Sequence, residues 1–132
     1  MLVAGALAAV AGGAPSTAWA LVRGADVLEG GRAAGSLVLW RETRTLPLVA
    51  AAVPVHLALS LGWAAVLAAA LPRGREAAWG AAGGLAIAAL DLEVVGRAFP
   101  RVRALAQAPQ WADHVAYGLT VGVVLQHRRG RR

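Results

Sequence analysis

Four long stretches of this sequence carry almost no charge, and they limit the possible folds more than any other feature. The stretches cover residues 2–22, 46–71, 77–96 and 109–126. The first two contain no charged residue, whereas the third contains Asp91 and Glu93 and the fourth contains Asp113 and His114. A helix needs about 20 mostly apolar residues to cross the hydrocarbon core of a bilayer, and it satisfies its own backbone groups there. We therefore expect an all-α, multi-pass membrane protein with four transmembrane helices that run antiparallel in sequence order.

The composition favours a single membrane domain over residues 1–132. Of these residues 58% are hydrophobic and 15% are charged, whereas a soluble domain carries about 25% charged residues. All 13 basic residues are arginines and cysteine is absent, which excludes lysine-based catalysis, disulfides and thiolate metal ligands. The net charge of +6 comes from arginines between the apolar stretches, so we expect the lipid bilayer as partner and no nucleic acid.

The connector at residues 26–40, between the first two stretches, has the pattern of an amphipathic helix. Apolar and small residues recur there at helical spacing, while Asp26, Glu29 and Arg32 occupy the other face. Trp40 would lie at the level of the lipid headgroups, where tryptophan is enriched. We expect an interfacial helix, and the alternative is a simple connector that packs on the bundle.

The first stretch has a second interpretation as a signal peptide, because Ala18-Trp19-Ala20 fits the small-x-small cleavage pattern. No basic residue precedes Arg23 and glycines interrupt the apolar core, so we expect a retained transmembrane helix. The two sides of the membrane carry nearly equal numbers of arginines, seven at the first and third connectors and six at the second connector and tail. The tail, residues 127–132, is the most basic segment, so we expect both termini in the cytoplasm and the protein in the cell (inner) membrane. Insertion in both orientations is the alternative that the nearly equal arginine counts leave open.

Small residues repeat at helical spacing on several of the stretches and mark packing faces. The positions are Gly12, Gly80, Gly84, Gly118 and Gly122. Small residues let helix backbones approach closely in lipid, where the hydrophobic effect does not drive helices together. We expect these glycines to pack helices, and the same faces would support a homodimer or a larger membrane complex.

Polar residues gather in the half of the predicted bundle that lies nearest the first and third connectors. The candidates for a polar pocket are Ser16, Thr17, His56, Asp91 and His114. Ionisable groups inside a span cost about 2.5–3.5 kcal/mol on insertion scales and mark functional sites by default. We expect the pocket to open on one side, with Pro15 bending the first helix beside it and Asp91 pairing with His114.

Several of the polar residues also have simpler, structural explanations. Glu93 and Arg97 are spaced for a salt bridge on one helix. Asp113 suits the first turn of its own helix or an arginine of the third connector. His56 can hydrogen-bond a neighbouring helix without any functional role.

The sequence predicts no catalytic site and no metal site. Ser16, Asp91 and His114 lie on three predicted helices without a nucleophile-elbow pattern, and the three histidines do not cluster as metal ligands. A haem ligated by His56 and His114 is a further alternative, although their depths differ by about 7 Å, one helical turn. We therefore expect neither an enzyme nor a bound cofactor.

Three short motifs carry a resemblance to other membrane proteins. They are Gly12-Gly13-Ala14-Pro15-Ser16-Thr17, Arg32-Ala33-Ala34-Gly35 and Asp113-His114-Val115-Ala116-Tyr117-Gly118. Together they resemble small uncharacterised multi-pass membrane proteins of high-GC, actinobacterial-type bacteria. The resemblance implies no activity, ligand or cofactor, but it agrees with four spans and draws attention to Pro15-Ser16-Thr17 and Asp113-His114.

The leading functional hypothesis is a small membrane protein whose one-sided polar pocket binds or passes a small polar solute or a proton. The alternative is a non-catalytic scaffold or accessory subunit, which packs against a larger membrane complex through its glycine-rich helix faces.

Overall fold

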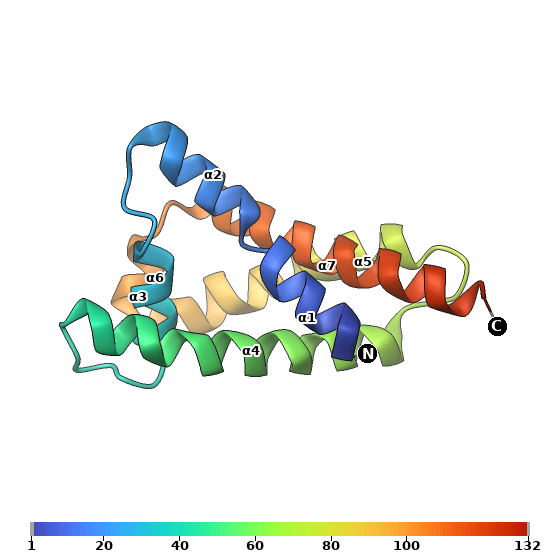
Figure 1. Ribbon diagram of the computed structural model, residues 1–132, viewed down its shortest axis with the longest axis horizontal. Helices are drawn as coiled ribbons and strands as arrows, with labels where there is room; N and C mark the ends of the chain where they lie inside the picture. The colour runs from blue at the N-terminus through green and yellow to red at the C-terminus, as the bar shows by residue number, and fades with distance from the viewer. Residues whose placement is uncertain (1, 132) are drawn as a thin grey trace.

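The computed structural model describes residues 2–131, and this part of the chain is 80% helical with no strand. Helices α4 and α7 run along the long axis of the molecule, the shorter α1 packs against both of them, and α2 points away from α4 (Figure 1). In chain order the elements are α1 (Leu2–Ala11), α2 (Ala14–Arg23), α3 (Glu29–Gly35), α4 (Thr45–Ala70), α5 (Glu76–Ala88), the π-helix η1 (Ala89–Val95), the 3-10 helix η2 (Gly96–Ala98), α6 (Pro100–Ala104) and α7 (Gln107–Arg129).

Among the described residues 2–131, three helical segments, rather than the predicted four, are long and apolar enough to cross a membrane. They are Leu2–Arg23, Thr45–Ala70 and Glu76–Ala98. The fourth predicted span lies in α7, which has 23 residues and is therefore about 35 Å long. Its length is sufficient but its composition is not, because polar residues occupy both of its ends as well as Asp113 and His114. The prediction of a fourth transmembrane helix over residues 109–126 is therefore wrong in composition, although the segment is helical.

The first apolar segment is interrupted near its middle. Gly12 and Gly13 form a turn between α1 and α2, and Pro15 lies in the first turn of α2. Proline suits the first turn of a helix because its missing N–H would have no helical partner there. The bend that the sequence predicts therefore comes from the two glycines, and Pro15 starts the next helix rather than kinking a continuous one.

The predicted interfacial helix over residues 26–40 is much shorter than expected. Only Glu29–Gly35 is helical, and this α3 packs on α4 with Gly35 directly against the backbone of Leu48. Trp40 lies beyond the helix in a turn, where it is 67% exposed. The glycine-rich sequence favours turns over a long helix, so this segment is mainly a connector packed on the bundle.

The core lies where α1, α4, α5 and α7 meet, and it is built largely from small side chains. Helix α1 packs against both α4 and α7, and α5 packs along α7. Because alanines and glycines line these contacts, the backbones approach closely and leave little internal space. The core residues are Ala4, Ala8, Ala64, Leu67, Ile87, Tyr117, Val121 and Leu125.

Candidate functional site

Asp91 and His114 form an ion pair between η1 and α7, with 3.4 Å between Oδ2 of the aspartate and Nε2 of the imidazole. The other ring nitrogen, Nδ1, lies 2.8 Å from the carbonyl oxygen of Gln110, one turn earlier on α7. A neutral imidazole has one N–H, so only the protonated ring can donate to both of these oxygens. Both side chains are partly exposed, at 28% and 21%. The pairing of Asp91 with His114 is confirmed, and neither side chain is fully buried.

The aspartate of this pair lies in a widened helical segment. The α-helix α5 ends at Ala88 and continues as the π-helix Ala89–Val95, which contains Asp91 near its start. π-helical turns are rare, and they occur frequently at functional sites. Leu92 of the same segment is buried, whereas Glu93 points to solvent and pairs with Arg97 at 3.5 Å. The predicted salt bridge between Glu93 and Arg97 is therefore confirmed, and it is separate from the Asp91 pair.

His56 contacts the end of α1 at the break in the first apolar segment. In an unbroken helix the carbonyl of Ala9 would accept from the N–H of Gly13. Instead, Nε2 of His56, from the middle of α4, lies 2.9 Å from that carbonyl oxygen. A carbonyl without a partner is costly in an apolar environment, so His56 has the structural role of satisfying a backbone group at the break. The structural alternative from the sequence, a hydrogen bond from His56 to a neighbouring helix, is therefore confirmed.

Asp113 contacts the other side of the same break. Its Oδ1 accepts a hydrogen bond of 2.8 Å from the backbone N–H of Ser16, in the first turn of α2. In an unbroken helix this N–H would bond to the carbonyl of Gly12. Asp113 therefore caps a different helix from its own, and the expectation that it caps α7 or meets an arginine of the third connector is wrong. An acidic group at a helix N-terminus is also favoured by the helix dipole.

The two hydroxyl residues of the predicted pocket take different positions. Ser16 lies beside Asp113, and its Oγ donates to the carbonyl of Gly13 at 3.4 Å. Thr17 is exposed, and within residues 2–131 its side chain makes no hydrogen bond. The structure thus brings Ser16, His56 and Asp113 to the break in the first segment, with His114 next to Asp113 in the chain. Thr17 is not part of this cluster.

The predicted packing glycines lie inside the molecule, mainly between α5 and α7. A Cβ added at Gly84 would collide with the carbonyl of His114, and one added at Gly118 would collide with the carbonyl of Gly80. The same holds for Gly122 against the carbonyl of Glu76. Gly12 lies against α7, where an added Cβ would be 3.0 Å from Cβ of Tyr117. These glycine faces are therefore already covered by neighbouring helices.

An ion pair that the sequence does not reveal lies at the opposite end of the bundle. Glu76 is 1% exposed, and its Oε1 is 3.2 Å from Nη1 of Arg129. The same guanidinium donates to the carbonyls of Ala68 and Leu71, at 2.7 and 3.1 Å, and so caps the end of α4. The only signal in the sequence is that Glu76 directly precedes an apolar stretch, which also fits an exposed first turn.

Tyr117 is a second buried polar residue that sequence reasoning misses. It is 8% exposed, and its hydroxyl donates to the backbone carbonyl of Ser60 on α4. Pro54 lies in the same helix without interrupting it. The hydrogen bond ties α7 to α4, so this tyrosine holds together two helices that carry the polar cluster.

Ion pairs also lower the pKa values of acidic groups in the connectors. Hydrogen bonds from the Arg44 side chain and from the backbone of Arg44 and Thr43 lower the pKa of Glu42 to about 2. The backbone N–H of Leu28 and the side chain of Arg32 lower the pKa of Asp26. These carboxylates remain charged at physiological pH and organise the turns in which they lie.

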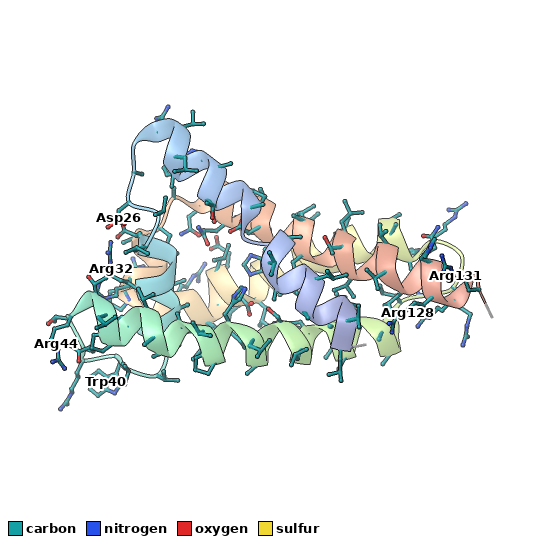
Figure 2. The ribbon with its side chains drawn as sticks, viewed as in Figure 1. Asp26, Arg32, Trp40, Arg44, Arg128 and Arg131 are labelled. Carbon is teal, nitrogen blue, oxygen red and sulfur yellow. The ribbon has the colours of Figure 1, made fainter. Side chains whose placement is uncertain are left out.

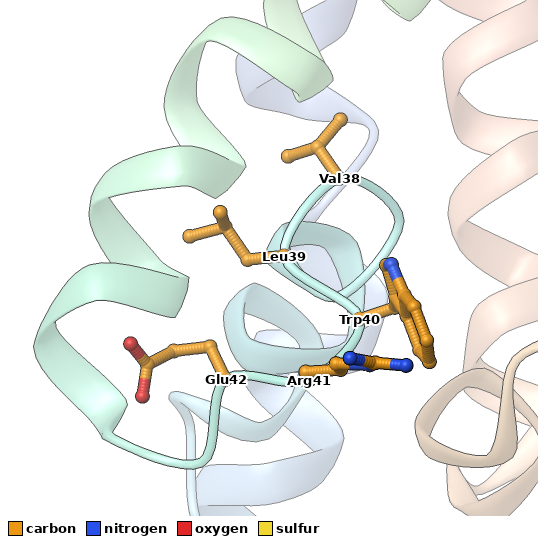
Figure 3. A pocket seen from close by; sticks show the side chains of 5 residues that line it. All are labelled: Val38, Leu39, Trp40, Arg41 and Glu42. Atoms are coloured by element: carbon orange, nitrogen blue, oxygen red, sulfur yellow. The ribbon is translucent and has the colours of Figure 1, made fainter.

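Two hollows on the surface lie away from the predicted polar pocket. One, of about 360 Å³, is lined by the five consecutive residues from Val38 to Glu42 (Figure 3). In this turn the guanidinium of Arg41 stacks on Trp40, with 4.2 Å to the ring centre. The other hollow, of about 490 Å³, lies between the start of α5 and the end of α7. Neither hollow is lined by a residue of the polar cluster.

The residues present do not fit the haem alternative. Both ring nitrogens of His114 face protein oxygens, and Nε2 of His56 faces the carbonyl of Ala9. The two imidazoles therefore do not offer a pair of free nitrogens to one iron. Within residues 2–131, no group of three or more histidine, aspartate or glutamate side chains is arranged to hold a metal ion.

Comparison with known proteins adds no family to this description, because no family model, curated protein or solved structure matches the chain.

Proposed function

We propose that this chain is a small integral membrane protein in which the Asp91–His114 pair carries a proton or binds a small polar solute. The observation that carries this proposal is the ion pair itself, whose aspartate lies on the apolar helical segment Glu76–Ala98 and whose side chains are both partly exposed. An ionisable group on such a segment has an energetic cost, and it marks a functional site by default. Neither residue is needed to satisfy the break in the first segment, since His56 and Asp113 do that.

A proton fits the site better than a larger solute. A proton requires a chain of titratable and hydrogen-bonding groups, whereas a solute also requires an enclosed volume. Asp91, His114 and the neighbouring Asp113 supply titratable groups, while the two surface hollows described above lie elsewhere. The π-helical segment around Asp91 supports the same assignment, because it changes the register of the backbone at the position of the carboxylate.

The glycine-rich faces do not favour the scaffold alternative. Gly80, Gly84, Gly118 and Gly122 are buried between α5 and α7, so a partner protein could not reach them without separating these helices. An accessory subunit would have to use a different surface.

Proton flux into liposomes tests the proposal. The purified protein is reconstituted into liposomes that contain a pH-sensitive dye, and a pH gradient is imposed. We expect flux above that of empty liposomes, and we expect Asp91→Asn or His114→Gln to reduce it to the empty level. Glu93→Gln is the matched control. It removes a negative charge two residues after Asp91, from the exposed salt bridge with Arg97.

Two results would contradict this assignment. If the wild type conducts no more than empty liposomes, the pair does not carry protons under a pH gradient. If Glu93→Gln reduces flux as much as Asp91→Asn, then the loss reflects charge on the segment rather than the pair. Circular dichroism on each variant separates these results from a loss of folding.

A further inference from the structure

One end of the molecule carries a concentration of arginines that the polar cluster does not involve. This end, which we call the arginine end, consists of the turn between α4 and α5 and the last turn of α7. Figure 2 shows Arg128 and Arg131 there, at the opposite end of the molecule from Asp26 and Arg44. Its exposed basic side chains are Arg73, Arg75, His127, Arg128 and Arg131.

The positive charge of the arginine end is not compensated by acidic residues. Glu76 is the nearest acidic residue, but it is buried and paired with Arg129. Within residues 2–131, none of the four exposed arginines forms an ion pair. At the opposite end acidic residues lie among the arginines, and Asp26, Glu42 and Glu93 pair with three of them. Four other arginines there, Arg23, Arg41, Arg101 and Arg103, form no ion pair within residues 2–131. Within residues 71–76 and 127–131, the arginine end therefore differs from the opposite end in exposing no acidic residue beside its arginines.

A hollow of about 490 Å³ opens at the arginine end, between the start of α5 and the end of α7. Its lining combines apolar Val123 and Ala77 with polar Gln126 and the basic His127 and Arg131. The indole of Trp79, less than one turn further along α5, is 53% exposed. The same order occurs across a membrane interface, where basic groups lie outermost, tryptophan lies at the headgroup level and apolar helix surface lies in the hydrocarbon core.

We propose that the arginine end binds the headgroups of anionic phospholipids. Guanidinium groups bind phosphate oxygens through paired hydrogen bonds, and basic clusters next to transmembrane helices are attracted to anionic lipid surfaces. His127 and Arg131 line the hollow that takes the headgroup, while Arg73, Arg75 and Arg128 supply the surrounding charge. This inference rests on the membrane location that the proposed function also assumes, but it does not depend on Asp91 or His114.

Native mass spectrometry of the full chain in mild detergent tests the proposal. The protein is titrated with phosphatidylglycerol, which is anionic, and with phosphatidylcholine, which is zwitterionic. The test variant is R73Q/R75Q/R128Q/R131Q. The matched control is R23Q/R41Q/R101Q/R103Q, which removes the same charge from the other end. We expect the wild type and the control to prefer phosphatidylglycerol, and the test variant to lose about fivefold in affinity for each arginine removed.

Three results would overturn the proposal. Equal losses in both variants would show that only net charge matters. Equal binding of phosphatidylcholine would show that acyl chains, and not anionic headgroups, are recognised. Displacement of phosphatidylglycerol by millimolar inorganic phosphate would show an ion site instead of a lipid surface.

A second variant and a separate readout keep the test decisive. If the fourfold variant loses its helical circular dichroism signal, R128Q/R131Q replaces it, because these two residues lie near the end of the chain. We then expect a smaller loss of phosphatidylglycerol binding, and no loss would overturn the proposal. If a variant loses lipid binding but keeps normal proton flux, the result bears on the arginine end and not on the Asp91–His114 pair. A protein that stays in solution without detergent would contradict both proposals.

Discussion

Asp113 of α7 accepts a hydrogen bond of 2.8 Å from the backbone N–H of Ser16, a residue 97 positions earlier in the chain. This contact caps α2 from outside, at the point where the first apolar segment breaks. On the other side of the break, His56 reaches the carbonyl of Ala9. Two conspicuous polar residues of the sequence therefore stabilise an interrupted helix, whereas the ion pair of Asp91 with His114 takes no part in it.

Removing the cap supplied by Asp113 should destabilise the protein. We expect Asp113→Ala to lower the free energy of unfolding by about 1 kcal/mol, the usual cost of losing a helix cap. Asp113→Asn retains a side-chain oxygen and should cost less. Titration of the detergent-solubilised protein with SDS, followed by circular dichroism, measures both values. Glu93→Ala serves as control, and an equal loss there would argue against a specific cap.

The contact between α5 and α7 should tolerate no side chain at Gly118. An added methyl would meet the carbonyl of Gly80, so we expect Gly118→Ala to cost about 1–3 kcal/mol of unfolding free energy. Gly62 in α4 is the matched control, because a Cβ there meets nothing within 4 Å. Gly62→Ala should raise stability by up to about 1 kcal/mol through helix propensity. The same SDS titration compares the two, and a neutral Gly118→Ala would contradict the close packing.

Substitution in the buried pair of Glu76 and Arg129 should lower the thermal unfolding temperature much more than substitution of the neighbouring Arg128. Arg129→Gln leaves the Glu76 carboxylate without its guanidinium and removes donors from the carbonyls of Ala68 and Leu71. We expect a clear fall in the thermal unfolding temperature, whereas Arg128→Gln should leave it unchanged because Arg128 is exposed. Thermal melts in detergent measure both variants. Equal melting temperatures would show that the pair contributes nothing.

The Glu42 carboxylate should titrate far below an ordinary glutamate. Hydrogen bonds from Arg44 hold its pKa at about 2, against an ordinary value of 4.5. Because the folded pKa is the lower one, the pair stabilises the turn fully above pH 4.5 and loses this effect as the pH falls towards 2. Carbon-13 NMR of the side-chain carboxyl follows the titration. In Arg44→Gln we expect the midpoint to move towards 4.5, and an unchanged midpoint would assign the shift to other causes.

The helical class follows from local properties that the sequence displays directly. Long uncharged runs predict helices wherever they occur, and three of the four runs give segments long and apolar enough to cross a membrane. The positions of Asp91 and His114, each near one end of an apolar stretch, also predict their pairing, because antiparallel neighbours bring such ends together. The salt bridge of Glu93 with Arg97 depends only on spacing along one helix.

The partners of the remaining polar groups were decided by the tertiary structure alone. Asp113 and His56 bond to backbone groups that exist as free partners only because Gly12 and Gly13 break the first segment. Arg129 finds Glu76 only once α7 lies along α5. Apolar spacing and helix propensity are local, so the sequence alone predicted that the four long apolar stretches are helical, but it predicted too long a helix over residues 26–40. A hydrogen bond depends on the distance between atoms far apart in the chain, and packing sets that distance.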